Sequence, residues 1–141
     1  LFDYLNERTG TYVLCFDIVG LMRINDEISR EAGDKVILES LKRINAAAGE
    51  DMPVLRIGGD EFVMVTGLDD VEKVTEIAKA VMAKNGGETA YKGGTVPVSI
   101  RSGAVMIRKP LKYSMLCHDF DEVISFARND GEVHFTKAEQ K

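Results

Sequence analysis

Apolar runs mark the strand-like parts of the chain. Residues 11–18, TYVLCFDI, are almost continuously apolar and rich in strand formers, which predicts a central strand covered on both faces. Further runs predict two hairpins and a short final strand, over residues 53–57, 61–66, 88–92, 95–107 and 133–135. We expect the first hairpin to turn at Gly58-Gly59, a favoured two-residue connection because both positions accept positive φ.

Apolar positions recur at helical spacing between these strands. They predict helices over residues 21–30, 35–48, 69–84 and 114–129. The first is expected to break near Gly33, and Asp34 is expected to be the N-cap of the second. Hairpins and helical crossovers both occur in this order, so the fold class is α/β, in the α+β sense. The expected sheet is mixed, mostly antiparallel and flanked by helices.

Length and charge narrow the classes of function. The chain has 141 residues, 45% of them hydrophobic, which fits a single domain over 1–141. Its 18 Lys and Arg against 23 Asp and Glu give a formal net charge of -5. This charge argues against a nucleic-acid partner and against contact of this domain with an anionic membrane. No apolar run approaches the roughly 18 residues that span a bilayer, and no signal sequence opens the chain.

Two acids stand out beside the predicted strands. Alternation along 11–18 places Asp17 on a partly apolar face, where an unpaired carboxylate is costly to desolvate. If the first hairpin lies beside this strand, Asp60 comes near Asp17, and like charges about 4 Å apart repel by roughly 4 kcal/mol at an effective dielectric near 20. A cation or a shared proton relieves that repulsion, and two carboxylates are a common protein contribution to a Mg²⁺ site. The alternative, a hairpin whose acids merely face solvent, is left open by spacing alone.

The stretch Gly58-Gly59-Asp60-Glu61-Phe62 resembles the signature of the GGDEF family of diguanylate cyclases. The resemblance extends in order and spacing from about residue 11 to 135. It includes Phe16-Asp17-Ile18, Arg23-Ile24-Asn25-Asp26, Ala32-Gly33-Asp34, Arg56 and Asp121-Glu122. It implies a fold similar to the palm of nucleotide cyclases and polymerases, with a ferredoxin-like core. It also implies that two copies, each holding one GTP, pair to make cyclic di-GMP and pyrophosphate.

The resemblance also implies roles for single residues. Asp17 and Asp60, with the backbone carbonyl of Ile18, would ligate Mg²⁺ or Mn²⁺, and Glu61 would complete the acidic, catalytic site. The substrate-binding positions that it implies are Gly58 and Gly59 against the nucleotide, Asn25 and Asp34 at guanine, and Arg128 at phosphate. A carboxylate suits guanine, since it can accept from the ring N–H and the amino group. The alternative roles, an N-cap for Asp34 and a turn residue for Asn25, stay open.

Several positions depart from the family pattern. Val19, Leu21 and Met22 replace a second Asp and a Phe-Lys pair, and that lysine is expected to meet phosphate charge. Glu132 brings a negative charge where a positive one is expected. Gly49-Glu50-Asp51-Met52 replaces the Arg-x-x-Asp of the family's product-inhibition site, so feedback at that site is not expected. His118 and His134 have no acid or cysteine at ligand spacing and are expected to be surface or satisfied histidines.

Three hypotheses remain, and the ordered matches leave little room for one of them, an unrelated α/β domain with a coincidental signature; the other two are functions. The first is an active, metal-dependent cyclase, and the second is a degenerate domain that binds GTP without turnover and acts as a regulatory or dimerisation module. Since the chain begins at Leu1, we expect it to be a fragment of a longer bacterial signalling protein. The expected domain is cytoplasmic, with a sensor or a membrane anchor upstream.

Overall fold

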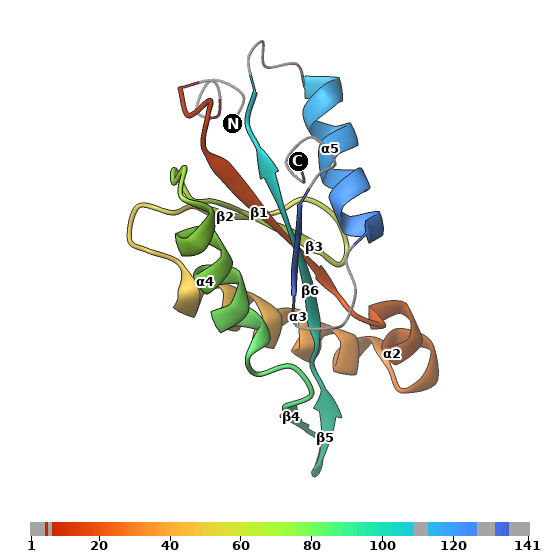
Figure 1. Cartoon of the computed structure of the whole chain (residues 1–141). Coiled ribbons are helices and arrows are strands. Elements are labelled where there is room, and N and C mark those ends of the chain that lie inside the picture. The colour runs from red at the N-terminus through yellow and green to blue at the C-terminus, as the bar shows by residue number, and fades with distance from the viewer. Residues whose placement is uncertain (1–4, 6, 109–112, 127–131, 136–141) are drawn as a thin grey trace.

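Figure 1 shows the computed structural model, which describes residues 5, 7–108, 113–126 and 132–135. Its main sheet has the strand order β2-β3-β1-β6-β7. The bounds are β2 Val54–Arg56, β3 Glu61–Val65, β1 Tyr12–Ile18, β6 Ile100–Met106 and β7 Val133–Phe135. Strand β1 pairs antiparallel with both β3 and β6, whereas β7 runs parallel to β6. The predicted mixed, mostly antiparallel sheet with 11–18 at its centre is confirmed.

Helices cover both faces of this sheet. Their bounds are α2 Leu21–Glu27, α3 Arg30–Ala47, α4 Val71–Met82 and α5 Tyr113–Phe126. Alternate residues of β1 serve the two faces, because successive side chains of a strand point to opposite sides. Leu14 and Phe16 pack with α3 and α4, and Val13 and Cys15 pack with α5. Within the described residues no helix combines the length and apolarity that a membrane crossing requires.

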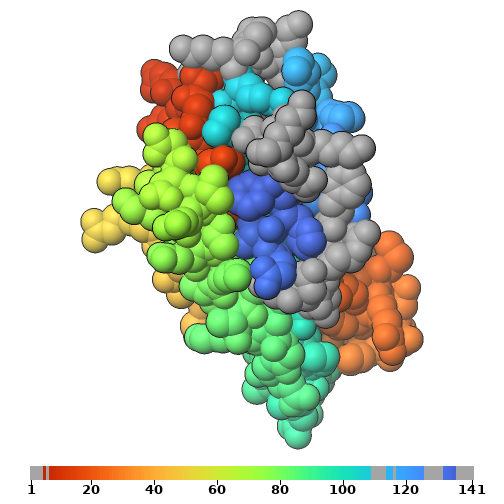
Figure 2. Space-filling view, viewed as in Figure 1, coloured from red at the N-terminus to blue at the C-terminus, as the bar shows by residue number. Residues whose placement is uncertain are grey.

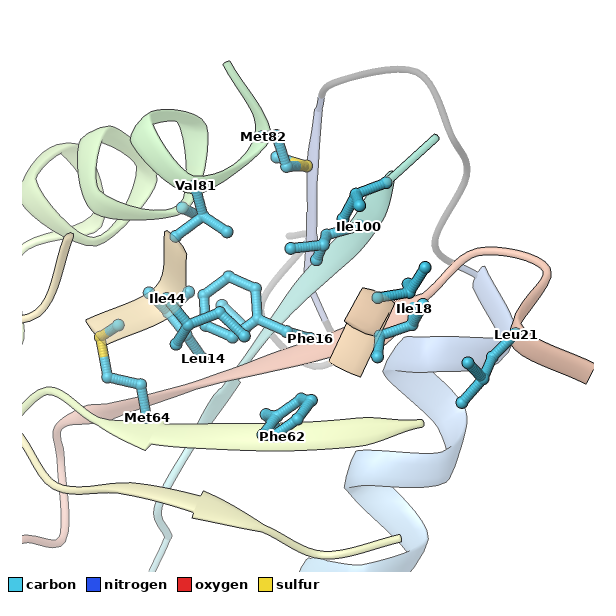
Figure 3. Packing of buried hydrophobic residues seen from close by; sticks show 14 of the residues in the cluster. Leu14, Phe16, Ile18, Leu21, Ile44, Phe62, Met64, Val81, Met82 and Ile100 are labelled. Carbon is cyan, nitrogen blue, oxygen red and sulfur yellow. The ribbon is translucent and has the colours of Figure 1, made fainter. Parts of the chain in front are cut away.

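The larger core lies on the α3 and α4 face. Figure 3 shows Leu14, Phe16 and Phe62 on the sheet, with Ile44 of α3 and Val81 of α4 beside them. All five side chains are at most 1% exposed. Removing a large aromatic side chain from such a core costs about 3–5 kcal/mol. This packing holds β1 and β3 together. The end of β1 and the start of β3 lie beside the acids considered below.

Helix α3 begins earlier than its sequence suggests. Ser29 is the N-cap, and its Oγ accepts a hydrogen bond from the backbone N–H of Ala32 at 3.1 Å. The prediction that Asp34 caps this helix is wrong, and Asp34 lies exposed inside α3. Gly33 does not interrupt the helix. It leaves room for the Asn25 side chain of α2, since a Cβ on Gly33 would lie 1.7 Å from Oδ1 of Asn25.

The first hairpin is confirmed, but its turn differs from the prediction. The connection covers residues 57–60, and the N–H of Ile57 donates to the carbonyl of Glu61 at 3.0 Å. Neither Gly58 nor Gly59 has a positive φ. The guanidinium of Arg56 instead fastens this turn, because it donates to the carbonyls of Gly58 at 3.0 Å and Gly59 at 2.7 Å.

The second hairpin forms a small separate sheet of β4 (Glu88–Tyr91) and β5 (Gly94–Pro97). Its turn has positive φ at Lys92 (43°) and Gly93 (77°), the conformation expected of a tight two-residue connection. The prediction of one strand over 95–107 is wrong, since β5 ends at Pro97 and β6 begins at Ile100. Asn85 holds this break, donating to the carbonyl of Ile100 at 2.8 Å and accepting from its N–H at 2.9 Å. The hairpin projects from the body of the molecule (Figures 1 and 2).

Candidate active site

Strand pairing places three charged residues side by side. In the register of the sheet, Asp17 of β1 lies opposite Glu61 of β3 and opposite Arg101 of β6. Asp60 is fixed next to them, because its backbone carbonyl accepts a hydrogen bond from the N–H of Ile18 at 2.9 Å. One carboxylate oxygen from each of Asp17, Asp60 and Glu61 lies within 4.8 Å of the others. Two neighbouring strands and one turn therefore gather the acids that the sequence singles out.

Burial makes this cluster electrostatically unfavourable. The side chain of Asp17 is 5% exposed, so solvent does not screen it, and Asp60 and Glu61 are half-buried. The alternative, that the hairpin acids Asp60 and Glu61 merely face solvent, does not fit their half-buried side chains. Burial raises the pKa of Asp17, and Asp60 adds to this rise while Arg101 opposes it. Burial also raises the pKa of Glu61, and the charges of Asp17, Asp60 and Asp121 add to it. A cation at the cluster would relieve the desolvation and the repulsion together.

The guanidinium of Arg101 already supplies part of that positive charge. Its Nε donates to Oδ2 of Asp17 at 2.9 Å, and its Nη2 donates to the same oxygen. Sequence reasoning missed this residue. The sequence signal is a lone charged residue in the largely apolar run VSIRSGAV. Its importance depends on the pairing of this strand with residues 11–18, which the sequence does not specify.

The chemistry of the donors fits a hard divalent cation. Mg²⁺ and Mn²⁺ prefer carboxylate and carbonyl oxygens, and the cluster offers three carboxylates at the edge where β1 ends. Ile18, expected to lend its carbonyl, directly follows Asp17 at that end. The donor set therefore suits the ion that the resemblance implies, although Arg101 engages one of its oxygens.

The glycines of the turn have no role inside the described structure. A Cβ added to Gly59 would meet nothing within 4 Å, and one added to Gly58 would make ordinary contact with the Glu61 side chain at 3.7 Å. Neither glycine has a positive φ that would need it. The space above these two residues is open beside the acidic cluster, which fits a ligand that approaches the backbone closely.

The two residues expected at guanine come from neighbouring helices. Asn25 of α2 lies against Gly33 of α3, and Asp34 is the next residue along α3. Asn25 is half-buried and Asp34 is exposed. Because Ser29 performs the N-capping, the Asp34 carboxylate is not used for that purpose. Arg128, expected at phosphate, lies outside the described residues.

The departures from the family pattern have different surroundings. Met22 on α2 is 77% exposed and brings an apolar side chain to the place of an expected lysine. Glu132 forms an ion pair with Lys79 of α4, with the Nζ and Oε2 atoms 3.4 Å apart. Its negative charge is therefore partly balanced by a helix on the far side of the sheet from α5.

A second group of possible ligands lies on α5. Nδ1 of His118 is 3.7 Å from Oδ1 of Asp119 and 3.7 Å from Oε2 of Glu122. The expectation that no acid lies at ligand spacing from His118 is therefore wrong. Asp119 already pairs with Arg108 at 2.8 Å, and His118 is largely exposed. This group is thus an ordinary surface network of charged side chains.

Solved structures with similar folds agree with this architecture. The GGDEF domain of TpbB, also called YfiN, from Pseudomonas aeruginosa matches with a TM-score of 0.77 and 28% identity, covering 89% of this chain and 76% of that one. The diguanylate cyclase SiaD of the same organism, solved with its activator SiaC, matches with a TM-score of 0.80 and 19% identity. The match covers 96% of this chain and 55% of that one. The GGDEF domain of DgcB from Caulobacter crescentus, in complex with c-di-GMP, matches with a TM-score of 0.74 and 20% identity. The match covers 94% of this chain and 86% of that one. The last two show likeness of fold alone.

Curated relatives include an uncharacterized membrane protein of Staphylococcus aureus strain USA300. It is 26% identical over 129 residues, which are 89% of this chain and 36% of the relative. The chain thus spans about a third of the length of such relatives. The model of the family described as "Diguanylate cyclase, GGDEF domain" matches residues 3–134. With the sheet order and the acidic cluster beside the diglycine turn, this match shows that the chain belongs to the GGDEF family of diguanylate cyclase domains.

Proposed function

We propose that this domain is an active diguanylate cyclase, which condenses two GTP molecules into cyclic di-GMP where two copies of the domain meet. The observation that supports it most is the buried Asp17 carboxylate grouped with Asp60 and Glu61. Such a cluster is costly without a cation, and a divalent cation bound to a triphosphate relieves it. A domain without ligand would not need three acids at this edge of the sheet.

In this proposal each residue has a defined task. Asp17, Asp60 and the carbonyl of Ile18 hold Mg²⁺ or Mn²⁺, and Glu61 completes the acidic site. The bound ion supplies neutralisation of charge on the triphosphate. The open backbone at Gly58 and Gly59 lets the phosphates come close.

The remaining residues orient the substrate. Asn25 and Asp34 hold the guanine edge, and Arg128 contacts phosphate. The 3′-hydroxyl of one GTP then loses its proton to water as its oxygen forms a bond to the α-phosphorus of the partner's GTP, and the bond from that phosphorus to pyrophosphate breaks. The 3′-hydroxyl of the second nucleotide attacks the α-phosphorus of the first in the same way and closes the ring. The products are one cyclic di-GMP and two pyrophosphates.

A second function, GTP binding without turnover, is favoured by two observations. Arg101 engages the Asp17 carboxylate, and Met22 offers no donor to phosphate. Loss of one preorganised donor commonly lowers the rate by on the order of 10²–10³. In that case the domain regulates a partner by binding GTP or by dimerising.

Incubation with GTP and Mg²⁺, followed by chromatography of the nucleotides, separates the two functions. The cyclase makes cyclic di-GMP, and Asp60→Asn abolishes it because one metal-binding carboxylate is lost. Asp69→Asn, an exposed acid in the loop before α4, is the matched control and should keep full activity. Saturable GTP binding without product would support the second function. Unchanged product formation by the Asp60→Asn variant would overturn the metal site.

We further propose that the domain belongs to a longer cytoplasmic or membrane-anchored signalling protein. The support is that it spans only 36% of its curated relatives, which are themselves named as membrane proteins. An upstream sensor would then control how two copies pair. Determining the activity of the whole protein with and without its upstream part tests this arrangement.

A further inference from the structure

Arg101 stands out because it shares the Asp17 carboxylate with the proposed metal site. Two of its nitrogens, Nε and Nη2, donate to the single oxygen Oδ2 of Asp17. The contact joins facing residues of adjacent strands, so the backbone register brings the two side chains together. A carboxylate oxygen that accepts two charged donors has little capacity left for another cation.

The two partners differ in freedom. The side chain of Asp17 is 5% exposed, whereas that of Arg101 is 33% exposed. Asp17 therefore stays in the cluster, and the guanidinium can leave it towards solvent. The cluster without Arg101 holds the three carboxylates Asp17, Asp60 and Glu61. Arg101 thus gives the ion-free cluster the positive charge that makes it tolerable.

We propose that Arg101 is an internal competitor for the divalent cation, so that this residue sets how tightly the site holds its ion. The inference rests on the proposed function, because it takes Asp17 as a metal ligand. An ion that binds at Asp17 must displace the guanidinium or share the carboxylate with it. Either event costs part of an existing charge-assisted hydrogen bond, so the ion affinity of the wild-type site is lower than its three carboxylates alone would give.

Mn²⁺ binding provides a direct test, since free Mn²⁺ is measured by electron paramagnetic resonance without any turnover. We expect Arg101→Ala to bind Mn²⁺ on the order of tenfold more tightly than the wild type, the usual scale of coupling between two linked binding events. Arg101→Gln keeps a polar side chain of similar length and should show the same direction of change. Lys73→Gln removes one positive charge from exposed α4 over the opposite face, and it should leave the affinity unchanged.

A double-mutant cycle identifies the competed ligand. In an Asp17→Asn background, Arg101→Ala should change Mn²⁺ affinity less than it does in the wild type, because the shared carboxylate is gone and only the charge of Arg101 near Glu61 remains. Thermal unfolding gives a second readout. The Arg101→Ala variant should melt below the wild type without ion, and added Mn²⁺ should raise its melting temperature more than that of the wild type.

The outcomes separate this inference from the proposed function. If Arg101→Ala and Arg101→Gln bind Mn²⁺ equally or more weakly than the wild type, while Asp60→Asn loses binding, the metal site stands and the competition by Arg101 is overturned. If the wild type and every variant fail to bind Mn²⁺ at millimolar concentration, both the metal site and this inference fail. If binding appears or tightens when Arg101 is removed, and does so more with Asp17 present than in the Asp17→Asn background, the inference is supported; an equal gain in both backgrounds would overturn competition for the Asp17 carboxylate.

Discussion

At the scale of single residues, the acidic cluster lowers the stability of the ion-free domain at neutral pH. Asp17 and Glu61 both have pKa values raised by burial and by neighbouring carboxylates. A carboxylate whose pKa is higher in the folded state than in the unfolded state binds more protons when folded. Stability therefore falls as pH rises through the window between the two values. Without a metal ion, these two groups oppose folding at neutral pH.

The variant Glu61→Gln tests this directly. It removes a charge that faces Asp17 across the strands, so we expect the ion-free domain to gain on the order of 1 kcal/mol of stability at pH 7, a modest value because Glu61 is partly exposed. The gain should shrink as pH falls towards the ordinary pKa of glutamate, where the wild-type side chain also becomes neutral. Chemical denaturation at several pH values with EDTA present measures it.

Glu76→Gln, on exposed α4, is the control for that measurement and should change stability little at any pH. A Glu61→Gln variant that is less stable than the wild type at pH 7 would contradict the assignment of electrostatic repulsion. In the presence of Mg²⁺ and GTP the order of stabilities should reverse, because the wild type then uses this carboxylate in the acidic site.

Sequence alone identifies Asp17, Asp60 and Glu61, because each follows an apolar strand-like run or a glycine pair. It does not identify Arg101, which acquires its meaning only from the register that sets it opposite Asp17. Cross-strand neighbours are far apart in the chain, here by 84 residues, and the hydrophobic pattern does not specify which strands pair. The Arg101 contact is therefore knowable only from the fold.

At the scale of elements, the position of the Asn25 side chain between α2 and α3 depends on Gly33. The backbone of α3 at this position leaves room for the Asn25 side chain, which an added Cβ would meet at 1.7 Å from its Oδ1 atom. That atom is the far end of a flexible side chain, so it can rotate away without moving either helix. The cost then falls on the position of Asn25 rather than on the fold.

Gly33→Ala should therefore separate binding from stability. Alanine in a helix interior is favoured over glycine by up to about 1 kcal/mol, which offsets the local repacking. We expect stability within about 1 kcal/mol of the wild type, together with GTP-analogue affinity weakened on the order of tenfold, the cost of losing one hydrogen bond to the base. Isothermal titration with a non-hydrolysable GTP analogue measures the affinity.

Asn25→Ala is the reference for this result, and Asn45→Ala, at an exposed position on α3, the helix that carries Gly33, is the neutral control. Gly33→Ala should resemble Asn25→Ala. Wild-type affinity for the analogue in both variants would show that Asn25 does not contact the nucleotide.

Element types are predictable from the sequence more fully than element ends. The apolar period predicts all of the described helices in the region of α2 to α5. The predicted start of α3 is wrong because Ser29 and Asp34 are both residue types that cap helices, and in the structure Ser29 makes the cap hydrogen bond. The sequence predicts a single strand over 95–107 because the apolar run continues through Val98, whereas the structure has two strands there. The break depends on hydrogen bonds from the distant Asn85 side chain.

At the scale of the whole molecule, the proposed reaction needs two GTP molecules, and each copy of the domain is proposed to hold one of them. The family match and the sheet order establish the architecture of a single copy. The pairing of copies is a different matter, because a surface contact leaves no periodic pattern in the sequence. Exposed Met22 at 77% and Leu38 at 62% are single apolar side chains, and single exposed apolar residues are common on monomers.

If catalysis needs two copies, tethering should raise the activity of this domain. Fusing a parallel two-stranded coiled coil upstream of Leu1 replaces the concentration of a second copy in solution by an effective concentration of about 1 mM. At micromolar protein, the rate per domain should then rise by up to about 10³-fold and become independent of protein concentration, whereas the rate of the untethered domain should grow with concentration. Initial rates of cyclic di-GMP formation over a dilution series measure both behaviours.

The fusion that carries Asp60→Asn is the inactive control. A fused domain that binds GTP and makes no product would leave GTP-dependent regulation as its function, and equal rates per domain in both forms at every dilution would mean that one copy suffices.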